Sequence, residues 1–342
     1  MNKNQIFLRI TAIWALSESA LGGILHAVKI PLTGLFIGGS AVVLLTLMAY
    51  LGAEKKDFLK AFLLVLIVKA VVSPHTPPTA YLAVSFQAFL AIFLFGFIRI
   101  KSIAAMLLSV FSLVESGFQK LLVLTLIFGQ NLWDSINIFA SFIVMQFMQN
   151  NEEISSVNLS LVLITGYLII HLIAGLLIGG WASTFSKTIF NKLNSQGKTE
   201  YFLQSYINIE QPLKKKKRVR FAYLVFPLAV VIMVLSYIMP VFDRNVGLSA
   251  LAMVVRATVI LIFWYYILGP YVKRILLNFL QKKKNKYNSD IEEIFVLFPT
   301  LKQIVASEWK IYQQNKPQIS FRDFLENIFL IALTIELEKE PS

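Results

Sequence analysis

The 342-residue chain contains no cysteine and few charged side chains. The absence of cysteine excludes a disulfide framework, a thiolate metal site and a cysteine nucleophile. Charged residues make up 15% of the chain, whereas they make up roughly 25% of ordinary soluble domains. Apolar residues make up 57%, and the mean hydropathy is +0.68. This composition excludes a typical soluble enzyme and predicts a polytopic membrane protein.

Long apolar segments recur along the chain, and each is long enough, at around 20 residues, to cross a hydrocarbon core of about 30 Å. We therefore predict an all-α integral membrane protein, with a six-helix bundle, a two-helix hairpin and a cytoplasmic helical tail. The eight predicted spans cover residues 6–28, 31–53, 58–73, 79–97, 103–129, 157–186, 221–240 and 249–272.

These spans divide the chain into four predicted parts. Residues 1–186 form a six-span substrate-binding membrane domain, and residues 187–220 form a basic cytoplasmic loop. Residues 221–272 form a two-span membrane hairpin, and residues 273–342 form a cytoplasmic helical tail with a possible role in coupling.

Positive charge is concentrated in a few connections, although the chain as a whole carries a formal charge of +13. Residues 187–220 and 273–286 are rich in Lys and Arg, whereas residues 121–186 contain neither. Loops rich in Lys and Arg stay on the cytoplasmic side of a membrane. The pattern predicts a multi-pass protein of the cytoplasmic (inner) membrane with both termini in the cytoplasm.

The run from Lys214 to Arg218 adjoins an apolar segment. A nucleic-acid footprint is one interpretation of such a run. Attraction to anionic headgroups explains a basic cluster beside a span without any further partner. We therefore expect membrane lipid, and no nucleic acid, as the partner of this run.

Small residues recur at every fourth position of the first span, at Thr11, Ala15, Ser19, Gly23 and Ala27. Such a stripe lets two helices approach closely. The stripe predicts either tight packing within the bundle or a surface on which another membrane subunit docks. Similar stripes occur at Gly34 and Gly38, and at Gly175, Gly179 and Ser183.

Polar side chains inside the predicted spans are the candidates for a binding site, because each costs free energy in hydrocarbon unless it is paired or hydrated. Glu18 shares one helical stripe with His26, and Glu115 shares another with Gln119. Two interpretations remain open: structural ion pairs with the lysines, or an outward-opening cavity for a small polar solute with both signs of charge. The candidate substrate-binding residues are Glu18, His26, Lys69, His75, Gln87, Glu115, Gln119, Lys120 and His171.

Two predicted outer loops lie near these candidates. Residues 73–79 contain three prolines, which stiffen the chain and either hold His75 over a cavity or simply reverse the chain. Residues 130–156 are long enough to form a lid. Their apolar part, residues 138–148, is too short to cross a membrane and so lies in the interface or folds back over the bundle.

Motifs for metal, cofactor and catalytic chemistry are missing. The three histidines lie on different elements without ligand spacing, so we expect no metal and no cofactor. Gly197-Lys198-Thr199 lacks the first glycine of a phosphate-binding loop, because Lys192 stands there. We expect no enzyme activity. The alternative is a membrane-embedded enzyme acting on a lipid or isoprenoid, with Glu18, Glu115 and His171 as acid and base groups.

The first six spans resemble the substrate-capturing S component of energy-coupling-factor (ECF) transporters. The likeness rests on six helices with both ends inside, on the small-residue first helix, and on outer loops gathered over the polar positions. The resemblance implies uptake of a vitamin-like or other small polar solute bound from outside. It also implies partners: a transmembrane T component and two cytoplasmic ABC-type ATPases that energise transport.

The second part is similar to a piece of that T component. Arg256 and the sequence Val296-Leu297-Phe298-Pro299, which leads into a helix, carry this likeness. The family's Ala-Arg-Gly, which seats the ATPases, is replaced by residues 311–316. A degenerate coupling module and an unrelated tail both remain open. Residues 291–313 and 321–337 are predicted to form amphipathic helices.

Overall fold

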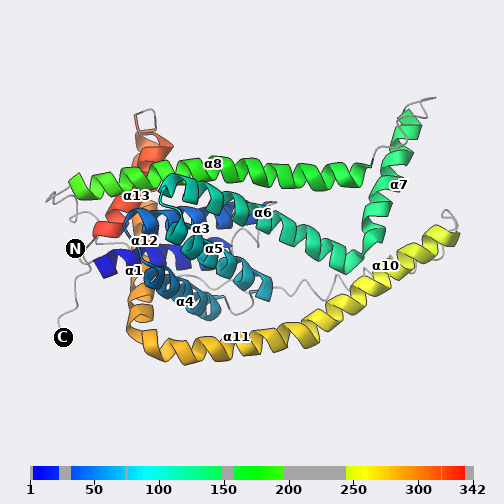
Figure 1. Ribbon diagram of the computed structural model, residues 1–342, viewed down its shortest axis with the longest axis horizontal. Coiled ribbons are helices and arrows are strands. Elements are labelled where there is room, and N and C mark those ends of the chain that lie inside the picture. The colour runs from blue at the N-terminus through cyan, green and yellow to red at the C-terminus, as the bar shows by residue number, and fades with distance from the viewer. Residues whose placement is uncertain are drawn as a thin grey trace. The chain divides into compact units, whose positions relative to one another are not determined.

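The computed structural model describes residues 3–22, 32–73, 76–147, 158–195, 244–316 and 318–335, and within these ranges it contains helices and no strand. The all-α prediction is confirmed (Figure 1). The helices are α1 (Lys3–Leu16), α3 (Thr33–Tyr50), α4 (Lys55–Val72), α5 (Pro78–Phe97), α6 (Lys101–Phe128), α7 (Gln130–Phe147), α8 (Leu159–Ser195), α10 (Arg244–Phe263), α11 (Gly269–Lys284), α12 (Asn288–Gln314) and α13 (Phe321–Thr334). Short π-helical turns η1 (Ser17–Leu21) and η3 (Trp264–Leu268) follow α1 and α10, and a 3-10 turn η4 (Asn285–Tyr287) precedes α12.

Among the described residues, five helical segments are long and apolar enough to cross a membrane. The predicted membrane-embedded, multi-pass character therefore has structural support. α4 is of similar length but carries several charges in its first two turns, and also Lys69. The predicted span 221–240 lies outside the described residues. The five segments are Thr33–Tyr50, Pro78–Phe97, Lys101–Phe128, Leu159–Ser195 and Met253–Gln314.

The chain forms two compact units. The first unit comprises Met1–Gly117, Leu168–Ile207 and Val272–Ser342, and therefore contains the tail as well as most of the predicted bundle. The second unit comprises Phe118–Tyr167 and Asn208–Tyr271. α6 and α8 each contribute to both units.

In the second unit, α7 follows α6 after a single turn at Gly129, whose φ of 75° favours glycine. The Trp133 indole N–H of α7 donates to the Thr125 hydroxyl of α6 at 3.0 Å. α7 also packs against α10, and the Arg256 guanidinium of α10 lies against Gly129. Much of the predicted outer segment 130–156 is thus a helix of 18 residues.

The core of the first unit is built around α4. A capping box begins this helix, because the Asp57 carboxylate accepts from the Glu54 backbone N–H at 2.8 Å and the Glu54 side chain caps the first turn. From Phe58 to Lys69 most side chains of α4 are buried. α4 packs against α1 and α5, and α3 packs against α1 and α5 as well.

Glycines bring α6 and α8 of the first unit close together. A Cβ atom at Gly175 would lie 2.8 Å from the Cα of Val110, and one at Gly179 would lie 2.7 Å from the Cα of Met106. Real side chains do not come this close to a neighbouring backbone. This predicted small-residue stripe is therefore used for packing within the chain.

Positive side chains gather at one end of the first unit, which we call the basic end. Lys3 of α1 lies against Gly52, and Lys55 of α4 lies against Gly96. The ammonium of Lys101 lies 5.5 Å from the centre of the Tyr50 ring. The start of α1 and the connections α3–α4 and α5–α6 therefore lie together, as the predicted alternation of spans requires.

The tail helices α12 and α13 pack on this basic end. They contact α1, and α12 also contacts α4, where the Lys60 ammonium donates to Asp290 at 2.8 Å. In Figure 1 both helices run across the ends of α1 and α8 rather than along them. The buried Arg9 of α1 donates from Nη1 to the Leu333 carbonyl at 2.6 Å. A cation at this place offsets the negative end of the α13 dipole.

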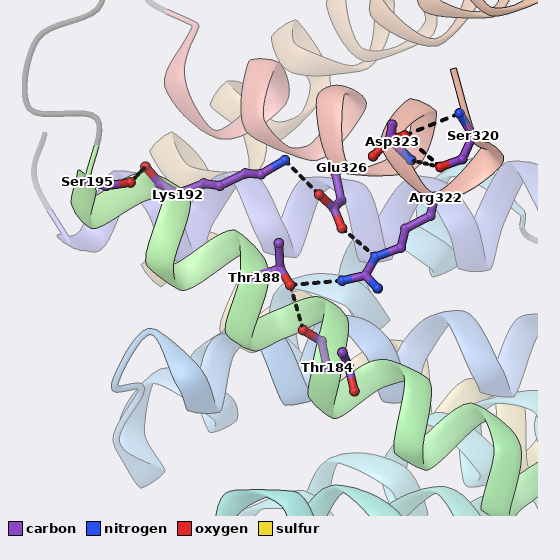
Figure 2. A network of polar contacts seen from close by, with 8 residues as sticks. All are labelled: Thr184, Thr188, Lys192, Ser195, Ser320, Arg322, Asp323 and Glu326. Carbon is purple, nitrogen blue, oxygen red and sulfur yellow. Dashed lines mark hydrogen bonds and ion pairs between the residues drawn. The ribbon is translucent and has the colours of Figure 1, made fainter. Parts of the chain in front are cut away.

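A polar network joins α13 to α8 (Figure 2). The Glu326 carboxylate, 3% exposed, accepts from Lys192 Nζ and from Arg322 Nε, each at 2.7 Å. Arg322 also donates from Nη2 to the Thr188 hydroxyl at 3.0 Å. Both carboxylate oxygens therefore have a cationic donor, as a buried charge requires.

We predict that Glu326→Gln loosens α13 from the bundle. The amide keeps the shape but loses the charge-assisted hydrogen bonds, which are worth about 1.5–3 kcal/mol each when formed with a charged group. Hydrogen exchange of the α13 amides should become faster while the α4 amides keep their protection. Glu292→Gln, which changes an exposed glutamate of α12, is the matched control and should leave both unchanged. Equal exchange in the two variants would contradict the role of Glu326.

The ion pairs of Glu326 also predict that α13 detaches from the bundle at low pH. Burial raises the pKa of Glu326, but the hydrogen bonds from Lys192 and Arg322 and their positive charges outweigh it and hold the pKa below that of an ordinary glutamate. A carboxyl with a depressed pKa stabilises the fold above its unfolded pKa, and this stabilisation is lost as the pH falls through the folded value. Protease cleavage between α12 and α13 should therefore increase below about pH 4, and Glu326→Gln should weaken this dependence.

Candidate functional site

Glu18 and Lys69 form a sealed ion pair. Glu18 lies in the π-helical turn η1 and Lys69 lies near the end of α4, and Lys69 Nζ donates to Glu18 Oε2 at 2.5 Å. The Lys69 side chain is 6% exposed and the Glu18 side chain 2%. η1 is tied to α3 by a hydrogen bond of 2.6 Å between the hydroxyls of Ser17 and Ser40. Of the two interpretations left open above, the structural ion pair describes these two residues.

Gln87 of α5 is buried without a partner for its carbonyl. The side chain is 3% exposed, and its Oε1 atom accepts no hydrogen bond. Its amide nitrogen lies against Gly38 of α3, where a Cβ atom would meet it at 3.2 Å and would meet Leu113 of α6 at 3.0 Å. The missing side chain of Gly38 therefore leaves room for Gln87 of α5 and Leu113 of α6 to pack against the same position of α3. An amide oxygen in such a place is costly unless a ligand or water donates to it.

Glu115 of α6 stands at the end of a buried stripe. Leu108 and Ser112 precede it on the same face and are fully buried, while Glu115 is half-buried. Its Oε2 atom has no hydrogen-bond partner, and neither has the hydroxyl of Ser112. At 1.5 Å per residue, Glu115 lies about 21 Å along α6 from Lys101, and Gln87 lies about 15 Å along α5 from Phe97. Both residues therefore lie near the middle of their helices, far from the helix ends.

We call Gln87, Ser109, Ser112 and Glu115 the polar seam. The hydroxyl of Ser109 is also buried without a partner. The sequence analysis missed Ser109 and Ser112, because serine is common in membrane helices as a packing residue. Ser112 lies three residues before Glu115 and Ser109 three residues before Ser112, and this run of polar residues in an apolar helix is the signal that identifies them.

The other candidates are distributed differently. His171 of α8 is 1% exposed and packs against Gly117 of α6 in the first unit. Gln119 and the exposed Lys120 continue α6 into the second unit. His26 and His75 lie outside the described residues. No group of three or more metal-binding side chains occurs in the described part of the chain.

A pocket of about 240 Å³ lies at the basic end of the first unit. It lies beside the connection between α3 and α4, at the opposite end of the helices from the predicted outward opening. It therefore does not correspond to the cavity expected for a solute. Its lining residues are Ala53, Glu54, Lys55, Phe58, Ile92, Phe95 and Gly96.

In comparisons with known proteins, no family model, no curated protein and no solved structure matches the chain. The chemistry of the site therefore has to be inferred from the residues themselves. The polar seam offers two unpartnered acceptor oxygens, from Gln87 and Glu115, and two hydroxyls that both donate and accept. Such a group is suited to binding a ligand that donates hydrogen bonds.

We predict that Lys69→Met destabilises the protein and that Glu18→Gln in the same chain restores it. The single variant leaves Glu18 buried without its counter-charge, which costs about 3–5 kcal/mol, whereas the double variant buries no charge. Thermal unfolding of the purified protein measures both changes. Lys56→Met is the matched control, because its pair with Glu54 is exposed and its loss should change little. Equal stability of Lys69→Met and Lys56→Met would contradict the sealed pair.

Proposed function

We propose that the protein is the substrate-binding subunit of a membrane transporter for a small polar, vitamin-like solute, and that Gln87 and Glu115 contact this solute. The observation that carries the proposal is the buried, unpartnered Oε1 atom of Gln87 beside α6. Such a group does not stabilise an apolar bundle, because a buried acceptor without a hydrogen bond lowers the stability of the fold by about 1–3 kcal/mol. A ligand that donates to it turns this cost into binding free energy and specificity.

The charge of the site favours a solute that donates hydrogen bonds. A solute with both signs of charge needs a cation in the site as well as an acid, but the ammonium of Lys69 is held by Glu18. The remaining acidic group of the first-unit candidates is Glu115, and its Oε2 atom is unpartnered. We therefore narrow the proposal from a solute with both signs of charge to one recognised through amine or amide N–H groups.

The arrangement of the bundle supports uptake from outside. Lysines gather at the basic end of the first unit, and the positive-inside rule assigns such an end to the cytoplasm. Glu115 lies more than half-way along α6 from that end. Within this proposal both termini are cytoplasmic, the solute enters from the opposite end, and a T component with two ATPases supplies the energy, as the ECF resemblance implies.

We predict that the purified protein retains a solute that Glu115→Gln and Gln87→Leu variants lose. Protein extracted in mild detergent is washed, denatured and assayed for released small molecules by mass spectrometry. Wild-type protein should release at least one polar solute, and each variant should retain at least tenfold less, since each loses a direct hydrogen bond worth about 1.4 kcal/mol or more.

Thr46→Val is the matched control for these variants. The Thr46 hydroxyl is also buried and unpartnered, but it lies near the basic end of α3, away from the polar seam. This variant should retain the solute. All variants should unfold at temperatures close to that of the wild type. If wild-type and Glu115→Gln proteins release the same molecules in the same amounts, the proposed function is wrong.

A further inference from the structure

The turn between α12 and α13 carries an unusual set of side chains. From Trp309 to Arg322 the chain contains Lys310, Lys316 and Arg322 but no acidic residue. Large apolar side chains within the same stretch are exposed: Trp309 is 43% exposed, Ile311 41% and Phe321 54%. We call residues 309–316 and 318–322 the aromatic-basic tip.

The tip is held in shape by its rings. The ring centres of Trp309 and Tyr312 lie 5.6 Å apart, and those of Tyr312 and Phe321 lie 6.1 Å apart. Phe324, which is buried, contacts all three rings and connects them to the core of the first unit. The exposed parts of Trp309 and Phe321 therefore belong to an ordered cluster.

The network of Figure 2 fixes the position of the tip relative to α8. α8 is apolar from Leu159 to Phe185 except for a few hydroxyl, glycine and histidine positions, and its first charged residue is Lys187. Arg322 at the edge of the tip donates to Thr188, one residue further on. The tip is thus held at the level where the apolar part of α8 ends. That level is the boundary between hydrocarbon and headgroups.

The α12–α13 turn lies beyond α8 in Figure 1, on the side away from α1 and α4. Tryptophan and tyrosine with lysine and arginine are the residues that proteins place at membrane interfaces, where rings rest among headgroups and cations meet phosphate. We propose that the aromatic-basic tip is a membrane anchor that inserts its rings at the cytoplasmic interface and binds anionic lipid headgroups through Lys310 and Lys316.

The exposed rings beside the positive charges distinguish a lipid surface from a protein partner. An acidic protein segment would also be attracted by Lys310 and Lys316, but it would not require exposed rings at the depth where the apolar part of α8 ends. A lipid surface matches both the charges and the rings. The anchor would hold the tail helices in the plane of the membrane, against the end of the bundle.

The absence of cysteine makes a direct test possible, because a single introduced cysteine carries a nitroxide label without competition. Ile311→Cys places the label in the tip, and Glu292→Cys places it at the exposed, acidic start of the same helix α12. The labelled full-length protein is reconstituted in vesicles of phosphatidylglycerol and phosphatidylcholine. Electron paramagnetic resonance then compares the collision rates of each label with oxygen, which enters the membrane, and with a water-soluble nickel chelate.

We expect the label at position 311 to collide more with oxygen than with the nickel chelate, and the label at position 292 to do the reverse. Reversing the tip charges with Lys310→Glu and Lys316→Glu should move the label at 311 towards water, and so should vesicles of phosphatidylcholine alone. Lys302→Glu, on α12 outside the tip, should leave it in place. Circular dichroism checks that each variant keeps its helices.

A label at position 311 that is as water-exposed as the label at 292 in anionic vesicles would overturn the anchor. A label protected only after an acidic protein is added would instead assign the tip to a protein partner. Insertion that does not respond to charge reversal would refute binding of anionic headgroups. These outcomes do not depend on whether the polar seam binds a solute, so the two proposals fail separately.

Discussion

A carboxylate withdrawn from water must find a cation close by, and Glu18 and Glu326 meet this requirement in different parts of the bundle. Glu18 is paired with Lys69 between η1 and α4, and Glu326 is held by Lys192 and Arg322 between α8 and α13. In both places the ion pair joins elements that are distant in the sequence. Removing one partner of such a pair leaves an uncompensated buried charge, so each pair penalises any arrangement of the helices that separates its members.

The polar seam departs from this pattern, and the contrast is what makes it a candidate site. Gln87 Oε1, Glu115 Oε2 and two serine hydroxyls are buried without partners in the same bundle that pairs the buried carboxylates of Glu18 and Glu326 with cations. The bundle thus satisfies Glu18 but leaves the amide oxygen of Gln87 and one carboxylate oxygen of Glu115 without a donor. Functional sites are where such costs are tolerated.

Hydropathy predicted the apolar helices, because a membrane span leaves a long uniform signal, and α3, α5 and α6 were predicted to within a few residues. α8 extends to Ser195, well past its predicted end at 186, and the helix α7 was predicted only as part of an outer segment. The tail helices also followed from their periodicity. Pairing between helices could not be predicted, since Lys69 was as compatible with a solute as with Glu18. The docking of α13 depends on Arg9 and Lys192, whose partners are far away in the sequence.

The hydrogen bond from Arg9 to the Leu333 carbonyl joins residues 324 positions apart. Because α1 is synthesised long before Leu333, Arg9 has no access to this acceptor during most of translation. During that time α1 has neither α12 nor α13 to cover it, and Arg9 lacks the Leu333 carbonyl as an acceptor. The burial of Arg9 against α13 is therefore completed only after α13 has been synthesised, although α1 precedes α13 by hundreds of residues.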